Sequence, residues 1–188
     1  MTGGIGAGKS EALAAFARHG AAVLSSDEIV HRLLRADGDV KAAVRERFGA
    51  EVVGADGEID RARVAEVVFA DPDELHWLEQ LLHPRVMGEY REWRQALAER
   101  AHPPAVCAVE VPLLYEVGAE RLFDAVVAVT APAEVRASRL GRSVAERERR
   151  LIRDEEKLER ADFAYVNDGT LADLDAFVAG VVAAVTSG

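Results

Sequence analysis

The 188-residue chain lacks several features that mark secreted, membrane-spanning or nucleic-acid-binding proteins. Its single cysteine excludes a disulfide within the chain. No apolar run approaches the roughly 18 residues of a membrane helix, and no signal-peptide core is present. Positive charge is also scarce, because 23 Lys and Arg against 33 Asp and Glu give a net charge of −10. That balance disfavours nucleic-acid binding by broad phosphate neutralisation. We therefore expect a cytoplasmic protein with no membrane or nucleic-acid partner.

The composition is that of an ordinary globular protein, with 49% hydrophobic and 30% charged residues. A chain of this length suffices for one substantial core with an appended subdomain. The lone Cys107 lies in the apolar run of residues 105–111, so we predict it to be a buried strand residue rather than a catalytic thiol. Nothing in the sequence indicates the oligomeric state.

The first ten residues contain the pattern G-x-x-x-x-G-K-S, with Gly3, Gly8, Lys9 and Ser10 in register. In a P-loop the glycines let successive backbone N–H groups point at phosphate oxygens, the lysine reaches the β- and γ-phosphates, and the serine hydroxyl ligates Mg²⁺. The helix predicted over residues 11–19 would direct its positive end at the same phosphates. A glycine-rich turn that matches by chance is the alternative. The pattern predicts a site for a nucleoside triphosphate with Mg²⁺.

No hydrophobic strand precedes Thr2, although a P-loop normally follows one. We expect the natural gene product to carry roughly 5–8 further apolar residues upstream, the usual length of a buried strand. Intact-mass measurement of the natural protein tests this expectation, and a chain that begins at Met1 would contradict it.

Short apolar runs alternate with helical segments, which predicts a parallel α/β sandwich. Residues 28–100 show only helical patterns and predict a helical insertion, with one apolar face formed by Val64, Val67, Val68 and Phe69. We expect a helix break at His83-Pro84, because proline cannot continue the hydrogen bonding of a helix. The four predicted strands cover residues 21–25, 105–111, 124–130 and 163–166.

Carboxylates follow two of the predicted strands. Asp27 lies just past the first strand, where ligands bind in open α/β sheets, although an Asp at this place also serves as a helix cap. Glu110 and Glu116 end or follow the second strand, and they suit either the Mg²⁺ shell or pairing with an arginine.

Arginines cluster between residues 136 and 153, interleaved with acidic residues. They indicate either a local basic site for an anionic ligand or a solvated, salt-bridged helix. The cluster comprises Arg136, Arg139, Arg142, Arg147, Arg149, Arg150 and Arg153.

Taken in order, the motifs resemble dephospho-coenzyme A kinase over nearly the whole chain. They are the P-loop, S-S-D-E-I-V-H-R at residues 25–32, L-L-H-P at 81–84, V-P-L-L-Y-E at 111–116 and N-D-G at 167–169. The resemblance implies ATP-dependent phosphorylation of the ribose 3′-hydroxyl of dephospho-coenzyme A, the last step of coenzyme A biosynthesis. It also implies a three-layer α/β/α sandwich of the P-loop NTP hydrolase fold. The implied domains are a nucleotide-binding core of residues 1–27, 101–138 and 161–188, a helical acceptor domain of residues 28–100 and a helical lid of residues 139–160.

The same resemblance assigns roles to residues of this chain. Asp27, Lys9 and Arg139 are the expected catalytic residues, with Asp27 as the base. Ser10 is the expected Mg²⁺ ligand, and His83, Leu114 and Glu116 are candidates for substrate binding, although a lone histidine such as His83 more often has a structural or surface role. The expected ATP-binding residues are Gly4, Gly6, Ala7, Gly8, Lys9, Ser10, Glu11 and Asn167.

Two departures from the family pattern stand out. This chain has Ser25 where the family usually has Asp, and its lid is shorter by several residues between Leu140 and Ser143. Two other functions remain open: another P-loop kinase of small molecules or nucleoside monophosphates, and a nucleotide-binding module that transfers no phosphate. A GTP switch is disfavoured because the chain has no N-K-x-D motif.

Overall fold

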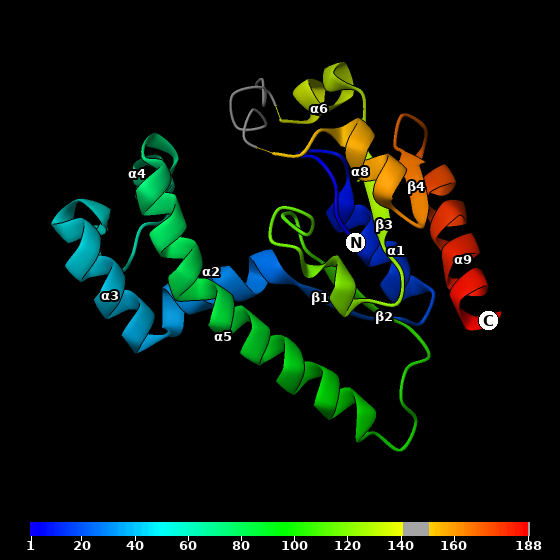
Figure 1. The fold of residues 1–188 in the computed structure, drawn as a ribbon, viewed down its shortest axis with the longest axis horizontal. Helices are drawn as coiled ribbons and strands as arrows, with labels where there is room; N and C mark the ends of the chain where they lie inside the picture. Colours follow the sequence, from blue (N-terminus) through cyan, green and yellow to red (C-terminus); the bar gives the residue numbers. More distant parts are fainter. Residues whose placement is uncertain (141–150, 188) are drawn as a thin grey trace. The chain divides into compact units, whose positions relative to one another are not determined.

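The computed structural model describes residues 1–140 and 151–187, and the chain divides into two compact units. Unit 1 comprises Met1–Ser25 and His102–Gly188, and unit 2 comprises Ser26–Ala101 (Figure 1). The predicted shortening of the lid and four arginines of the cluster lie outside the described residues. Those arginines are Arg142, Arg147, Arg149 and Arg150.

Unit 1 is mixed α/β, and its strands pair in parallel as the alternating pattern predicted. β1 pairs with β2, and β3 pairs with β4. All four strands fall within the predicted apolar runs, which confirms that part of the prediction. The elements of unit 1 are α1 (Lys9–Arg18), β1 (Ala22–Ser25), β2 (Cys107–Glu110), η2 (Ala119–Leu122), β3 (Val127–Thr130), α6 (Ala133–Leu140), α8 (Asp154–Arg160), β4 (Phe163–Val166) and α9 (Leu171–Ser187).

Met1 and Thr2 lie between the two pairs of strands. The Met1 α-amino group donates to the Val109 carbonyl at 2.6 Å, and the Met1 carbonyl accepts from Val111 N–H at 2.9 Å. Toward β3, the Thr2 N–H donates to the Val127 carbonyl at 2.9 Å, and the Thr2 carbonyl accepts from the Val129 N–H at 3.0 Å. The two residues thus occupy the position between β2 and β3 from which the P-loop starts.

The Met1 α-amino group is buried, and burial lowers its pKa to about 5 despite the opposing effect of the Glu110 charge. An unfolded chain holds this proton up to about pH 8, so between about pH 5 and 8 the unfolded state binds more protons than the folded state. We expect a polypeptide with a free Met1 amine to gain about 3 kcal/mol of unfolding free energy from pH 5 to pH 8, because one pKa unit is worth about 1.36 kcal/mol and each state is half titrated at its end of this range.

Urea unfolding at both pH values measures this gain. The control is the same chain extended upstream by about five apolar residues, which removes the charge from this position. We expect the two polypeptides to differ most at pH 5, and an equal difference at pH 5 and pH 8 would contradict the expectation.

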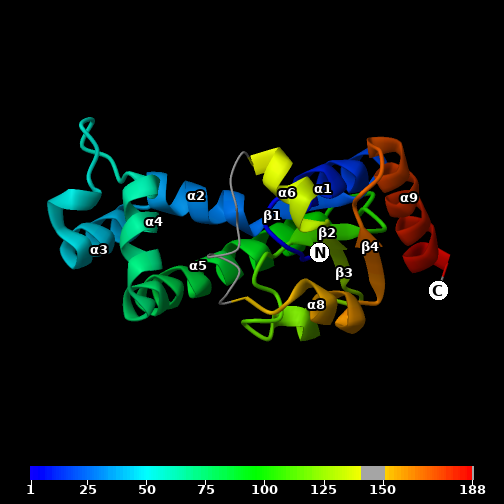
Figure 2. The ribbon, with the colours of Figure 1, turned by 90° about the horizontal axis from the view of Figure 1, so that it is seen from above.

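Helices cover the strands of unit 1 on both sides. Figure 2 shows α1 and α8 on opposite sides of the strands, with α9 beside α1. Two buried apolar clusters result, a large one beneath α1 and α9 and a small one formed by Leu114, Tyr115 and Val126. The large cluster comprises Met1, Ala12, Ala15, Phe16, Ala21, Ala108, Val127, Val129, Leu174, Val178 and Val181.

Cys107 lies in β2 as predicted, but it is exposed, so the prediction that it is buried was wrong. It is the first residue of the strand, paired with Ala22 at the start of β1. The other three residues of β2, which include Ala108 and Val109, are buried. The run of apolar residues therefore predicted the strand, while the burial of each residue depends on how far the covering helices reach.

Unit 2 is helical, as the absence of strand patterns predicted (Figure 1). Aspartates cap three of its helices: Asp37, Asp60 and Asp71 each accept a hydrogen bond from backbone N–H groups of the first turn. On α4, Val64 and Val68 are buried one turn apart, whereas Phe69 points away and is 47% exposed, which corrects its predicted place on the apolar face. The elements of unit 2 are α2 (Ser26–Ala36), α3 (Gly38–Phe48), η1 (Gly49–Val52), α4 (Arg61–Ala70) and α5 (Pro72–Ala98).

The predicted break at His83-Pro84 was wrong, because α5 continues through Pro84. Proline removes one N–H donor and crowds the carbonyls of the preceding turn. The N–H that Pro84 lacks would have donated to the Gln80 carbonyl, whereas the Arg85 guanidinium donates to the next carbonyl, that of Leu81, at 2.7 Å. Leu78 and Leu82, one turn apart and both before Pro84, are buried and hold the helix against its neighbours. Packing therefore outweighs the local cost of the proline.

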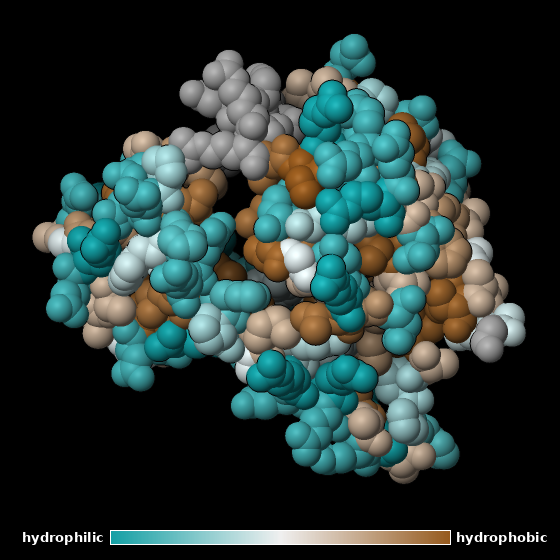
Figure 3. Space-filling view, viewed as in Figure 1, coloured by the Kyte–Doolittle hydropathy of each residue, from teal (hydrophilic) through white to brown (hydrophobic). Residues whose placement is uncertain are grey.

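No helix in the described ranges is long and apolar enough to cross a membrane. The face drawn in Figure 3 is largely hydrophilic, with smaller apolar patches between the polar side chains.

Candidate nucleotide-binding site

The loop before α1 requires glycine where the chain passes closest to its neighbours. Gly3 has a φ of 148°, and a Cβ on it would lie 1.8 Å from the Val129 carbonyl oxygen of β3. Gly8 caps α1 in the left-handed conformation, with a φ of 98°. No other residue type fits these positions without strain. The backbone thus folds as the P-loop pattern predicts, and α1 begins directly at its end.

Lys9 and Ser10 occupy the first turn of α1. The Lys9 ammonium group donates to the Gly4 carbonyl at 3.0 Å, so the side chain folds back over the loop. Ser10 is exposed, and among the described residues its hydroxyl has no hydrogen-bond partner. The first N–H groups of a helix have no acceptor within the helix, so a helix N-terminus with a lysine and an unengaged hydroxyl is a ready site for a phosphate group and its metal ion.

Arg139 and Asn167 meet the loop from two other elements. From α6, Arg139 Nη1 donates to the Gly6 and Ala7 carbonyls, each at 3.3 Å, and Nη2 donates to the Asn167 carbonyl at 3.3 Å. Asn167 follows β4 and is 4% exposed. Its Nδ2 donates to the Ala7 carbonyl at 2.8 Å. The structure thus brings two of the predicted site residues, 28 positions apart in the sequence, to the same loop.

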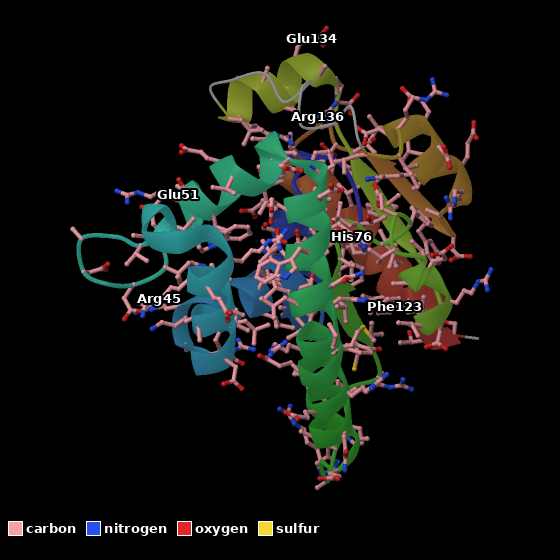
Figure 4. The ribbon with its side chains drawn as sticks, turned by 60° about the vertical axis from the view of Figure 1, so that its left-hand side comes forward. Arg45, Glu51, His76, Phe123, Glu134 and Arg136 are labelled. Carbon is pink, nitrogen blue, oxygen red and sulfur yellow. The ribbon has the colours of Figure 1, made fainter. Side chains whose placement is uncertain are left out.

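Arg136 and Asp154 lie on another side of the loop, and sequence reasoning did not single out either. Their side chains pair at 3.5 Å, and a Cβ on Gly4 would lie within 3.0 Å of both. Figure 4 shows Arg136 below α6, whereas Glu134 points away from the other side of the helix. A cavity of about 210 Å³ here is lined by Gly4, Arg136, Lys157 and residues 151–155. The only available signal for Arg136 was its membership of the arginine cluster.

Glu110 is 5% exposed at the end of β2 and accepts a hydrogen bond from the Ser25 hydroxyl at 3.2 Å. The two residues are paired in the register of β1 and β2. Ser25 therefore provides a neutral donor to a buried carboxylate.

Glu116 contacts a residue that the sequence did not reveal. Its Oε1 accepts from Lys157 Nζ at 3.0 Å and from Ile152 N–H at 3.1 Å. Lys157 is 1% exposed although it lies in a highly charged segment, and a lysine among acidic residues predicts a solvated helix. Leu114 is fully buried. The predicted substrate-binding roles of Glu116 and Leu114 stay predictions.

Two predicted site residues, Asp27 and His83, belong to unit 2. Asp27 is the second residue of α2, two positions after the end of β1, and it is exposed. Within the described part of the chain its carboxylate accepts no hydrogen bond, so its side chain does not cap the helix there. His83 is exposed on α5. In the described ranges, no group of three or more His, Cys, Asp or Glu side chains could hold a metal ion.

The dephospho-CoA kinase family model matches residues 1–173 of this chain. Among curated proteins, a dephospho-CoA kinase of Anaeromyxobacter dehalogenans is 40% identical over 90% of this chain and 82% of its own length. One from Streptomyces avermitilis is 38% identical over 96% of this chain and 90% of its own length.

Solved structures agree with these sequence matches. The crystal structure of TT1252 from Thermus thermophilus has a TM-score of 0.78 and 35% identity, over 97% of this chain and 94% of that chain. A dephospho-CoA kinase from Campylobacter jejuni has a TM-score of 0.69 and 26% identity, over 100% of this chain and 96% of that chain. Because the family model spans most of the sequence and these relatives align over nearly their full lengths, the chain belongs to the dephospho-CoA kinase family.

Proposed function

We propose that this protein transfers the γ-phosphate of ATP to the ribose 3′-hydroxyl of dephospho-coenzyme A, which gives coenzyme A and ADP. The observation that carries this proposal is an intact P-loop at the start of a chain that matches the family from residue 1 to residue 173. A P-loop alone identifies a nucleotide but not an acceptor, whereas the family match supplies the acceptor.

In this proposal the loop from Gly4 to Glu11 binds the phosphates of ATP through its backbone N–H groups and the start of α1. Lys9 would leave the Gly4 carbonyl and neutralise the β- and γ-phosphates, while Arg139 would neutralise charge on the transferring group. Phosphoryl transfer needs little covalent help from the protein, so positioning and charge stabilisation supply most of the rate.

The residues at the loop fit a magnesium ion bound mainly through the nucleotide. Ser10 offers a hydroxyl with no partner among the described residues, and Mg²⁺ characteristically uses one or two protein oxygens together with phosphates and waters. When bound, the ion would supply positive charge that offsets the charge developing on the phosphates. Ser10 would hold it at the first turn of α1.

Asp27 would orient the acceptor hydroxyl and take its proton, since it is an exposed carboxylate with no hydrogen bond to the described residues. We assign the acceptor to the helical residues 28–100, with His83, Leu114 and Glu116 as candidates for its contacts. Residues 139–160 would act as a lid that excludes water, which otherwise competes as acceptor. The helices on both sides of parallel strands support a three-layer sandwich for the core.

The test measures ADP release with ATP and Mg²⁺ in the presence of dephospho-coenzyme A, AMP, CMP or no acceptor. We expect rapid turnover only with dephospho-coenzyme A. Turnover with AMP or CMP would instead identify a nucleoside monophosphate kinase. Equally slow release in all four reactions would refute phosphotransfer and favour a nucleotide-binding module.

A further inference from the structure

Asn167 holds a fixed place at the end of the strands. Its backbone N–H donates to the Thr130 carbonyl at the end of β3, at 2.7 Å, and the residue follows β4 directly. The side chain is buried, with 4% of the residue exposed. A buried amide group needs hydrogen-bond partners to be tolerated. The acceptor that Asn167 Nδ2 contacts therefore indicates the role of this side chain.

That direction is toward the P-loop backbone. Asn167 Nδ2 donates to the Ala7 carbonyl at 2.8 Å, and a Cβ on Gly8 would lie only 2.3 Å from the same nitrogen. The amide group therefore fills the space that any Gly8 side chain would need. Gly8 is constrained twice, by its left-handed φ of 98° and by this contact.

Arg139 reinforces the same carbonyl. Its Nη1 lies 3.3 Å from the Ala7 oxygen, and its Nη2 donates to the Asn167 carbonyl at 3.3 Å. The Ala7 oxygen thus accepts from one neutral donor and one cationic donor. A carbonyl held by two donors does not rotate without losing both hydrogen bonds.

The orientation of this carbonyl fixes a donor on the opposite side. Within the planar peptide that joins Ala7 to Gly8, the carbonyl oxygen and the amide hydrogen point in opposite directions. When Asn167 and Arg139 hold the Ala7 oxygen on their side, the Gly8 N–H must point away from them. This N–H belongs to the loop whose backbone donors bind phosphate in the P-loop pattern.

We propose that Asn167 is a positioning residue for the triphosphate: by holding the Ala7 carbonyl it orients the Gly8 N–H that binds phosphate. The proposal rests on the proposed function only in taking the loop as the triphosphate site. The family resemblance implies instead that Asn167 contacts the adenine base, which is a different role. The two roles predict different ligand dependence, because inorganic tripolyphosphate has no base.

The test compares the full chain with Asn167→Leu, which keeps a similar volume and removes the donor without adding charge. Titration calorimetry with Mg²⁺ measures the affinities for ATP, GTP and inorganic tripolyphosphate. We expect all three to weaken by a similar factor, about five- to tenfold, as one hydrogen bond would give. The ratio of ATP affinity to GTP affinity should stay unchanged. Asp168→Ala is the matched control: its side chain is exposed next to Asn167, and all three affinities should remain within about twofold.

An altered ATP-to-GTP ratio with unchanged tripolyphosphate affinity would overturn the proposal in favour of base recognition. Unchanged affinities for all three ligands would refute both roles. Asn167→Ala provides a second variant with the same expected direction, and circular dichroism at the assay temperature checks folding. Failure of both variants to fold would also count against the proposal, because Asn167 would then support the fold itself. The titrations contain no acceptor, so their outcome is independent of whether dephospho-coenzyme A is phosphorylated.

Discussion

Asp27→Asn is expected to lower kcat by at least about a hundredfold while leaving ATP affinity nearly unchanged. A positioned general base contributes about 10²–10⁴ to the rate, and the amide cannot take a proton. The shape of the side chain is kept, so the variant separates proton transfer from packing. Steady-state kinetics with dephospho-coenzyme A, together with calorimetric titration of ATP, measure both quantities.

Glu28→Gln is the matched control for Asp27→Asn. Both residues are exposed acids in the first turn of α2, where negative charge stabilises the helix by about 0.3–1 kcal/mol. We expect the control to lose a similar small amount of stability and to keep kcat within about threefold. If Asp27→Asn lost stability with only a mild change in rate, Asp27 would be supporting the helix and the proposed base would be wrong.

Lys157→Ala is expected to lower the free energy of unfolding by about 3–5 kcal/mol, the usual cost of leaving a buried charge without its partner. Glu116 would keep its negative charge, and among the described residues the Ile152 N–H would be the remaining partner of its Oε1. Its Oε2 is already buried with no hydrogen-bond partner among the described residues. Urea denaturation followed by circular dichroism measures the loss.

Two further variants make this measurement specific. The double variant Glu116→Gln with Lys157→Met removes both charges but keeps the volume and an acceptor for Ile152, so it should recover most of the lost stability. Arg18→Ala breaks an exposed pair with Asp175 and should cost only about 0.2–1 kcal/mol. If Lys157→Ala cost no more than Arg18→Ala, the buried pair would not stabilise the fold.

The strands and the loop could be predicted because their signals are local. An apolar run between turns predicts a buried strand, and the positions of Gly3 and Gly8 predict backbone that no other residue adopts. The family could also be predicted, because each of its motifs is a short run of residues and the motifs occur in the expected order. These features depend on neighbouring residues, which the sequence displays directly.

The features that sequence reasoning missed depend on contacts between distant residues. Pro84 predicted a helix break, but α5 continues through it with Leu78 and Leu82 buried. The charged segment around Lys157 predicts a solvated side chain, but Lys157 is paired with Glu116, 41 positions earlier in the sequence. The same holds for Asn167 and Ala7, which are 160 residues apart. Local propensity carries no information about which distant group will lie opposite.

Met1 and Thr2 also determine how the two halves of unit 1 hold together. Among the described residues, the backbone hydrogen bonds that link β1 and β2 to β3 and β4 all pass through these two residues. The P-loop starts at the next residue, so its direction depends on these hydrogen bonds. A substitution that weakens these hydrogen bonds would therefore alter the direction of the loop as well as the stability of unit 1.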